Sequence, residues 1–139
     1  MKENIGMRAE QIRVLLVDDS AGFLELLAGY LSAHREFSVV GSATSGEGAV
    51  DQVVRLHPDL VLMDLTMPGM NGLQATSWIK KQPHAPRIII VTFHDQPGYR
   101  AMSSAAGADG YITKDNLTKP LIHMIHTLFD SSGRPQATA

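Results

Sequence analysis

The chain has 139 residues, of which 44% are hydrophobic, and this is the size of one globular domain. It contains no cysteine, which excludes disulfides, thiolate metal sites and cysteine nucleophiles. Twelve Lys and Arg residues against 14 Asp and Glu residues argue against a surface that binds nucleic acid backbones. Because no apolar run exceeds four residues and the first residues lack a signal-peptide pattern, we expect a soluble, cytoplasmic protein.

Two kinds of segment alternate along the chain. Short apolar segments rich in Val and Ile, typical of strands buried on both faces of a parallel sheet, cover residues 14–17, 37–41, 60–63, 88–91 and 110–113. Segments with apolar residues at helical spacing cover residues 23–31, 50–57, 73–79, 102–106 and 117–128. Strict alternation of this kind predicts a parallel sheet with right-handed crossovers and helices on both faces.

The ends of the predicted helices carry suitable capping residues. Ser20 and Asn71 are candidate N-caps, and Gly107 is a candidate C-terminal residue for the fourth helix. We expect one folded domain over residues 12–130. The polar segment 1–11 is predicted to be frayed, and residues 131–139 are predicted to be a tail or the start of a linker.

The residues that follow the predicted strands carry the candidate chemistry, because ligands of open α/β sheets bind beyond the carboxyl ends of the strands. In a flavodoxin-like sheet of order 2-1-3-4-5, strands one and four flank strand three, and their end residues meet over one spot. Strand five lies about 10 Å away, a gap that only a long side chain crosses. The residues at these strand ends are Asp18, Asp19, Asp64, Thr92 and Lys114.

Three clustered carboxylates repel one another unless a cation is present, and oxygen ligands with open positions favour Mg²⁺. A carboxylate surrounded by Mg²⁺, a hydroxyl and an ammonium suits phosphoryl transfer. We therefore expect Asp64 to attack the phosphorus and become an aspartyl phosphate, with Thr92 and Lys114 neutralising the phosphoryl oxygens.

From residue 12 to residue 129 the pattern resembles the receiver domain of bacterial two-component response regulators. The resemblance rests on the acidic pair, the segment 64–72, Thr92, Tyr111 and Lys114. It implies a flavodoxin-like (βα)5 three-layer sandwich with strand order 2-1-3-4-5, a phosphoprotein of a phosphorelay. It also implies that Asp64 takes its phosphoryl group from a sensor histidine kinase. In such a domain Thr92 and Tyr111 move as the switch and change the surface that partners bind.

The resemblance also implies a metal site. Asp19 and Asp64 would bind Mg²⁺ together with the backbone carbonyl of Thr66, and Asp18 would act through a metal-bound water. The only reactions implied are phosphorylation and slow dephosphorylation at Asp64, so no enzyme acting on a free metabolite is expected. Residue 66 and His94 occupy positions that tune the lifetime of the phosphate in the family.

The segment around Lys114 is similar to receivers that precede a LuxR-type helix-turn-helix domain, because Asp115 follows the lysine where many receivers have Pro. We expect the regulatory domain of a transcription regulator, with a possible homodimer on phosphorylation, no membrane contact, and DNA contact only through an output domain outside this sequence. The alternative is a stand-alone receiver that acts through protein–protein contacts. Phe93 departs from the family, which has a small residue after the threonine, and its ring could screen Asp64 from water or large donors.

Other interpretations remain open at the level of single residues. Asp18 and Asp19 could cap a helix, Asp64 could be a turn residue, and Lys114 could be solvated. A haloacid-dehalogenase-type phosphatase also has an aspartate nucleophile after a strand, but it needs a second Asp two residues later, where this chain has Thr66. A receiver that works without phosphorylation is the harder alternative, and Mg²⁺ binding with phosphorylation discriminates against it.

Overall fold

Strands and helices alternate strictly through residues 11–131, which are the residues that the computed structural model describes. The predicted ends, 1–11 and 131–139, lie outside these residues except for Gln11 and Ser131. No helix within 11–131 is long and apolar enough to cross a membrane. The elements are β1 (Ile12–Val17), α2 (Ala21–Ser32), β2 (Phe37–Ala43), α3 (Gly46–Leu56), β3 (Leu60–Met63), α4 (Gly72–Lys80), β4 (Arg87–Thr92), α5 (Pro97–Ala106), β5 (Gly110–Thr113), the 3₁₀ turn η1 (Lys114–Asn116) and α6 (Thr118–Ser131).

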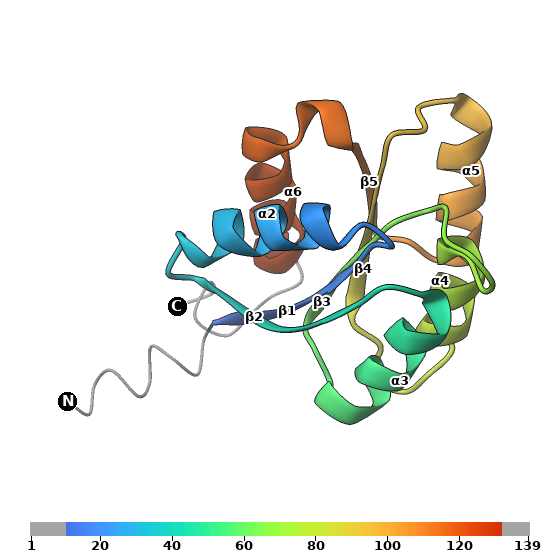
Figure 1. Ribbon diagram of the computed structural model, residues 1–139, viewed down its shortest axis with the longest axis horizontal. Helices are drawn as coiled ribbons and strands as arrows, with labels where there is room; N and C mark the ends of the chain where they lie inside the picture. The colour runs from blue at the N-terminus through green and yellow to red at the C-terminus, as the bar shows by residue number, and fades with distance from the viewer. Residues whose placement is uncertain (1–10, 132–139) are drawn as a thin grey trace.

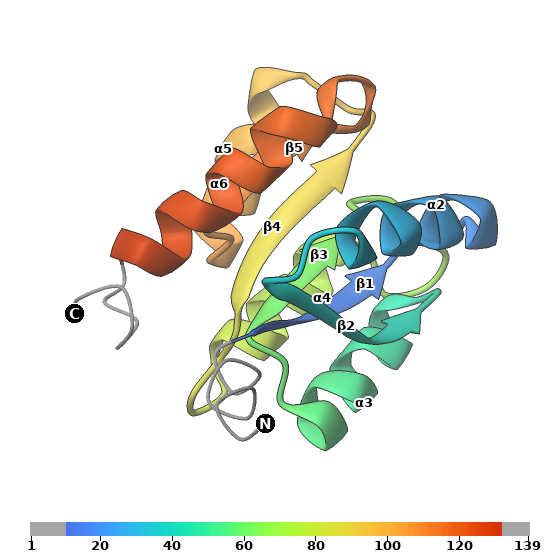
Figure 2. The ribbon, with the colours of Figure 1, turned by 90° about the vertical axis from the view of Figure 1, so that its left-hand side faces the viewer.

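The five strands form one sheet in the order β2-β1-β3-β4-β5, and all neighbouring strands are parallel. This confirms the predicted flavodoxin-like fold. Figure 1 shows α2 and α6 on one side of the sheet and α3, α4 and α5 on the other. In Figure 2 the arrowheads of β1, β3 and β4 point the same way, so these strands end at one edge of the sheet.

Each face of the sheet has its own hydrophobic core, because successive side chains of a strand point to opposite faces. Val14 and Leu16 of β1 pack towards α2 and α6, whereas Leu15 and Val17 pack towards α3 and α4. All four are almost completely buried. Burial on both faces explains why the central strands lack the alternation of polar and apolar residues seen in half-exposed strands.

The predicted caps are confirmed. Two of them, Ser20 and Asn71, begin α2 and α4, the helices that follow the acidic residues at the ends of β1 and β3. Ser20 Oγ accepts a hydrogen bond from the amide of Phe23 at 3.2 Å, at the start of α2. Asn71 and Gln74 form a capping box at the start of α4, with distances of 2.9 and 3.0 Å. Gly107 ends α5 with a φ of 106°, which glycine adopts at little cost.

The expected apolar stripe over residues 50–57 is only partly correct. Val53 is buried, but Val54 is 53% exposed. His57 has a φ of 50° and ends α3 instead of continuing it. The helical period alone could not show this, because the left-handed residue breaks the period at the last predicted position.

Gly72 fixes the start of α4 against the loop after β3. Its amide donates to the Leu65 carbonyl at 3.0 Å, and a Cβ at this position would lie 2.0 Å from the backbone oxygen of Asp64. No side chain fits at that distance without a backbone shift. Gly72 therefore allows the close approach of α4 to Asp64.

Gly72→Ala is expected to lower the free energy of unfolding by about 2–3 kcal/mol, because the backbone around Asp64 must move to accept the methyl group. Gly29→Ala is the matched control, since a Cβ on Gly29, exposed on α2, meets no atom within 4 Å. That substitution should instead stabilise the protein by about 1 kcal/mol through helix propensity. Chemical denaturation measures both changes, and stabilisation by both would contradict the close contact.

Candidate functional site

Three carboxylates meet where β1 and β3 end. Val17 and Met63 are paired in the sheet, so Asp18 and Asp64 follow a matched pair of residues on neighbouring strands. The Asp64 amide donates to the Val17 carbonyl at 2.9 Å and continues the ladder by one step. One oxygen from each of Asp18, Asp19 and Asp64 lies within 4.8 Å of the others.

Asp18 is 2% exposed and is held by two contacts. Its Oδ1 accepts a hydrogen bond from the Ser20 amide at 2.9 Å, which fixes the carboxylate at the start of α2. Its Oδ2 lies 2.6 Å from Lys114 Nζ, so the two form a buried ion pair. Asp19, by contrast, is exposed and gives the cluster its opening to solvent.

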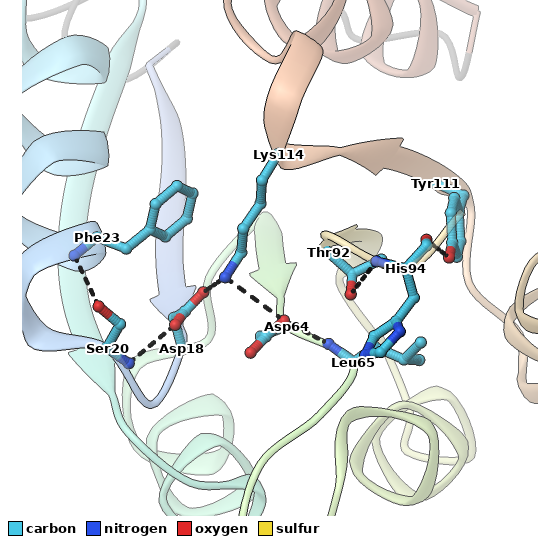
Figure 3. A network of polar contacts seen from close by, with 9 residues as sticks. All are labelled: Asp18, Ser20, Phe23, Asp64, Leu65, Thr92, His94, Tyr111 and Lys114. Carbon is cyan, nitrogen blue, oxygen red and sulfur yellow. Dashed lines mark hydrogen bonds and ion pairs between the residues drawn. The ribbon is translucent and has the colours of Figure 1, made fainter. Parts of the chain in front are cut away.

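Lys114 reaches the carboxylates from the first residue of η1, directly after β5. Its Nζ lies 3.7 Å from Asp64 Oδ1, farther than from Asp18, and the Lys114 side chain is only 7% exposed. Asp64 Oδ1 also accepts a hydrogen bond from the Leu65 amide at 2.9 Å. Figure 3 shows the side chains of Asp18, Asp64 and Lys114 converging. As expected, the long Lys114 side chain extends from the end of β5 past β4 to the carboxylate of Asp64.

The negative charge of the cluster exceeds the positive charge beside it. Burial, followed by the neighbouring charge of Asp18, raises the pKa of Asp64 from 3.8 to about 6 in spite of the opposing effect of Lys114. One ammonium therefore does not compensate three carboxylates. A cluster of oxygen ligands with surplus negative charge and one exposed member fits a hard divalent cation such as Mg²⁺.

Thr92 is linked to Tyr111 of β5 through the loop that follows β4. It ends β4, is 1% exposed, and its Oγ1 accepts a hydrogen bond from the His94 amide at 3.3 Å. The Tyr111 hydroxyl donates to the His94 carbonyl. Arg100 lies over the Tyr111 ring, 4.6 Å from its centroid, and is paired with Asp95 at 2.9 Å. Residues 92–95 thus join Thr92 to Tyr111 through hydrogen bonds and the ion pair of Asp95 with Arg100.

The remaining candidate residues lie around the cluster. Thr66 is exposed beside Asp64, and Phe93 is 72% exposed after Thr92. The aromatic ring of Phe23 was not among the residues predicted for the site, although its centroid lies only 4.4 Å from Lys114 Nζ. The signal that points to it is its position in the first turn of the helix after Asp19, which places it at the same edge of the sheet.

Asp64→Asn is expected to raise the free energy of unfolding in EDTA at pH 7.5, by up to about 3 kcal/mol. The folded protein holds a proton on Asp64 up to about pH 6, whereas the unfolded chain releases it near 3.8, so this carboxyl makes folding less favourable as the pH rises through that window. The gain should therefore vanish near pH 4. Denaturation curves at both pH values test it.

Asp51→Asn is the control, because the ion pair of Asp51 with Arg55 is exposed and is worth at most about 0.5 kcal/mol. Equal free energies of unfolding of the wild type and Asp64→Asn at pH 7.5 would contradict a destabilising buried carboxylate at position 64.

Comparison with known proteins agrees with this geometry. The regulatory protein DesR of Bacillus subtilis is 34% identical over 119 residues, which cover 86% of this chain and 59% of DesR. The chain thus spans little more than half the length of the curated relatives it matches. A LuxR-family two-component response regulator from Aurantimonas has a solved structure with a TM-score of 0.82 and 31% identity, covering 92% of this chain and 93% of that one.

A second solved structure of similar fold contains magnesium and BeF3. It is a complex of CheX, CheY, BeF3 and magnesium from Borrelia burgdorferi, with a TM-score of 0.79, 25% identity, and coverage of 85% of this chain and 89% of the matched chain. The family model of the response regulator receiver domain matches residues 14–126. With the acidic cluster, the threonine and the lysine at the strand ends, the chain belongs to the response regulator receiver domain family.

Proposed function

We propose that this domain is a switch activated by phosphorylation of Asp64. The observation that carries the proposal is the placement of Asp64, a buried carboxylate with a raised pKa, between two further carboxylates and the Lys114 ammonium. A nucleophile in such a position needs groups that neutralise an incoming phosphoryl group, and the strand ends supply them.

The donor set supports Mg²⁺ as the cofactor. Asp19, Asp64 and the backbone carbonyl of Thr66 would hold the ion, with Asp18 acting through a water molecule, because Asp18 is already paired with Lys114. When bound, the ion neutralises charge on the phosphoryl oxygens. The magnesium named in the Borrelia burgdorferi complex supports the same choice.

In the proposed transfer, a carboxylate oxygen of Asp64 attacks the phosphorus of a phosphohistidine on a sensor kinase. The bond from phosphorus to the imidazole nitrogen breaks, and the imidazole leaves with the electron pair. The Lys114 ammonium and the Thr92 hydroxyl would bind the phosphoryl oxygens, since both groups come from the same edge of the sheet as Asp64. Attack of water on the phosphorus would later break its bond to the Asp64 oxygen, which releases inorganic phosphate and restores the carboxylate.

The contacts beyond Thr92 support its role and that of Tyr111 as switch residues. A Thr92 hydroxyl that turns towards a phosphoryl group would give up the hydrogen bond from the His94 amide. The backbone carbonyl of His94 accepts from the Tyr111 hydroxyl, so the loop after β4 and the Tyr111 ring would move together. Thr66 follows Asp64 by two residues, and Phe93 and His94 follow Thr92, so we assign to these three residues the tuning of the phosphate lifetime.

The relatives indicate the output. DesR is a transcriptional regulatory protein, and the Aurantimonas protein is a LuxR-family response regulator. We infer that this domain is the regulatory part of a cytoplasmic transcription regulator, with a sensor histidine kinase as partner, a homodimer formed on phosphorylation, and DNA contact through a separate output domain.

Incubation with acetyl phosphate and Mg²⁺ should add one phosphoryl group, a mass increase that intact-protein mass spectrometry detects. Asp64→Asn should remain unmodified, because the amide does not form an acyl phosphate. Asp51→Asn, an exposed carboxylate variant on α3, should be modified as fast as the wild type. Equal modification of Asp64→Asn and the wild type would contradict the assignment of the phosphoacceptor.

Mg²⁺ should raise the melting temperature of the unphosphorylated domain, because it binds the folded state and relieves the repulsion among the carboxylates. Mg²⁺ at ten times its Kd corresponds to about 1.4 kcal/mol of added stability. Differential scanning calorimetry measures the effect, which Asp19→Asn should largely abolish and Asp51→Asn should preserve. A Mg²⁺ response that survives Asp19→Asn unchanged would place the metal elsewhere.

A further inference from the structure

Two phenyl rings face the ammonium of Lys114. The centroid of the Phe23 ring lies 4.4 Å from Nζ, and that of the Phe93 ring lies 5.1 Å from it. Phe23 belongs to the first turn of α2, which follows β1, and Phe93 follows β4. The two rings therefore come from the ends of the two strands that flank β3. Figure 3 shows the Phe23 ring beside the end of the Lys114 side chain.

Ordinary core packing does not explain Phe93. Its side chain is 72% exposed, the most exposed of the large hydrophobic residues in the described part of the chain. Contact of a ring face with a cation gives such a residue a different role, because an ammonium within about 6 Å of a ring centroid is attracted to it. The attraction is stronger for a desolvated cation, and the Lys114 side chain is only 7% exposed.

We propose that Phe23 and Phe93 form an aromatic clamp that positions the Lys114 ammonium and thereby sets the rate of phosphoryl transfer to Asp64. This inference rests on the proposed function, since it concerns the lysine that binds the phosphoryl group. Both phenylalanines are positioning residues, which act through Lys114.

The clamp meets a specific geometric need. The ammonium lies 2.6 Å from Asp18 and 3.7 Å from Asp64, so it would have to stay between the two carboxylates to contact a phosphoryl group on Asp64. A ring face attracts a cation over a broad area, which lets Nζ move between the two carboxylates without leaving the rings. Without them, the flexible four-carbon stem of lysine has many other rotamers available, some of which point to solvent.

Phe93 is the better position for the decisive test, because replacing an exposed ring leaves no cavity in the core. Phe93→Leu removes the π face and should slow phosphorylation by acetyl phosphate and Mg²⁺ about two- to fivefold. Phe93→Trp keeps a π face and should retain the wild-type rate or exceed it. Leu26→Ala, at a 66% exposed position on α2, is the matched control and should leave the rate unchanged.

The dependence on the lysine separates a clamp from a steric gate. In a Lys114→Gln background, which has no ammonium, Phe93→Leu should cause no further loss of rate. Phe23→Leu should behave in the same way, with its folding checked by thermal denaturation. A faster rate in Phe93→Leu, an equal effect of Leu and Trp, or an undiminished effect in the Lys114→Gln background would overturn the clamp.

A second measurement needs no phosphorylation. Ring currents from two phenyl faces should shift the ε-methylene proton resonances of Lys114 upfield, and each Leu substitution should move them back towards the values of a free lysine. If the wild type takes up phosphate but these resonances are unshifted, the clamp is wrong and the proposed function stands. If the resonances are shifted but no phosphate is accepted, the proposed function fails, and with it the effect of the clamp on the rate.

Discussion

The repulsion among three carboxylates is the constraint on which the rest of the site depends. Parallel pairing of β1 with β3 brings Asp18 and Asp64 to the same edge, where one oxygen of each lies within 4.8 Å of the other. Folding therefore buries Asp64 and holds it beside Asp18, and both effects, burial first, raise the pKa of Asp64. The sheet and its two cores supply the stability that opposes this repulsion, and a bound cation would relieve it.

The Lys114 ammonium compensates only part of the negative charge of the three carboxylates. Lys114 comes from the end of β5, two strands from β3, and the 3₁₀ turn after β5 starts at this residue. It is paired with Asp18, so the carboxylate of Asp64 is the less compensated of the two buried acids. The acid that we propose as the phosphoacceptor is thus also the one left with the larger share of unbalanced charge.

Much of the arrangement of the acidic cluster, Thr92 and Lys114 can be predicted from the sequence, because the ends of the strands can be recognised in it. Buried strands appear as apolar runs, so the order of residues alone places those that follow the runs, including Asp64, Thr92 and Lys114, at one edge of the sheet. The choice of Asp18 as the partner of Lys114 could not be predicted, since it depends on differences of about 1 Å between side chains. The contact of Gly72 with the Asp64 backbone and the ring of Phe23 beside the lysine likewise depend on how helices sit on the sheet.

The hydrogen bond of Tyr111 to position 94 uses the main chain, not the histidine ring. Every amino acid offers the same carbonyl oxygen there, so the link does not restrict which residue occupies the position. The imidazole of His94 packs on Tyr99 instead, with ring centroids 4.9 Å apart. A substitution at position 94 would therefore change the ring that packs on Tyr99 and still leave the carbonyl that accepts from Tyr111 in place.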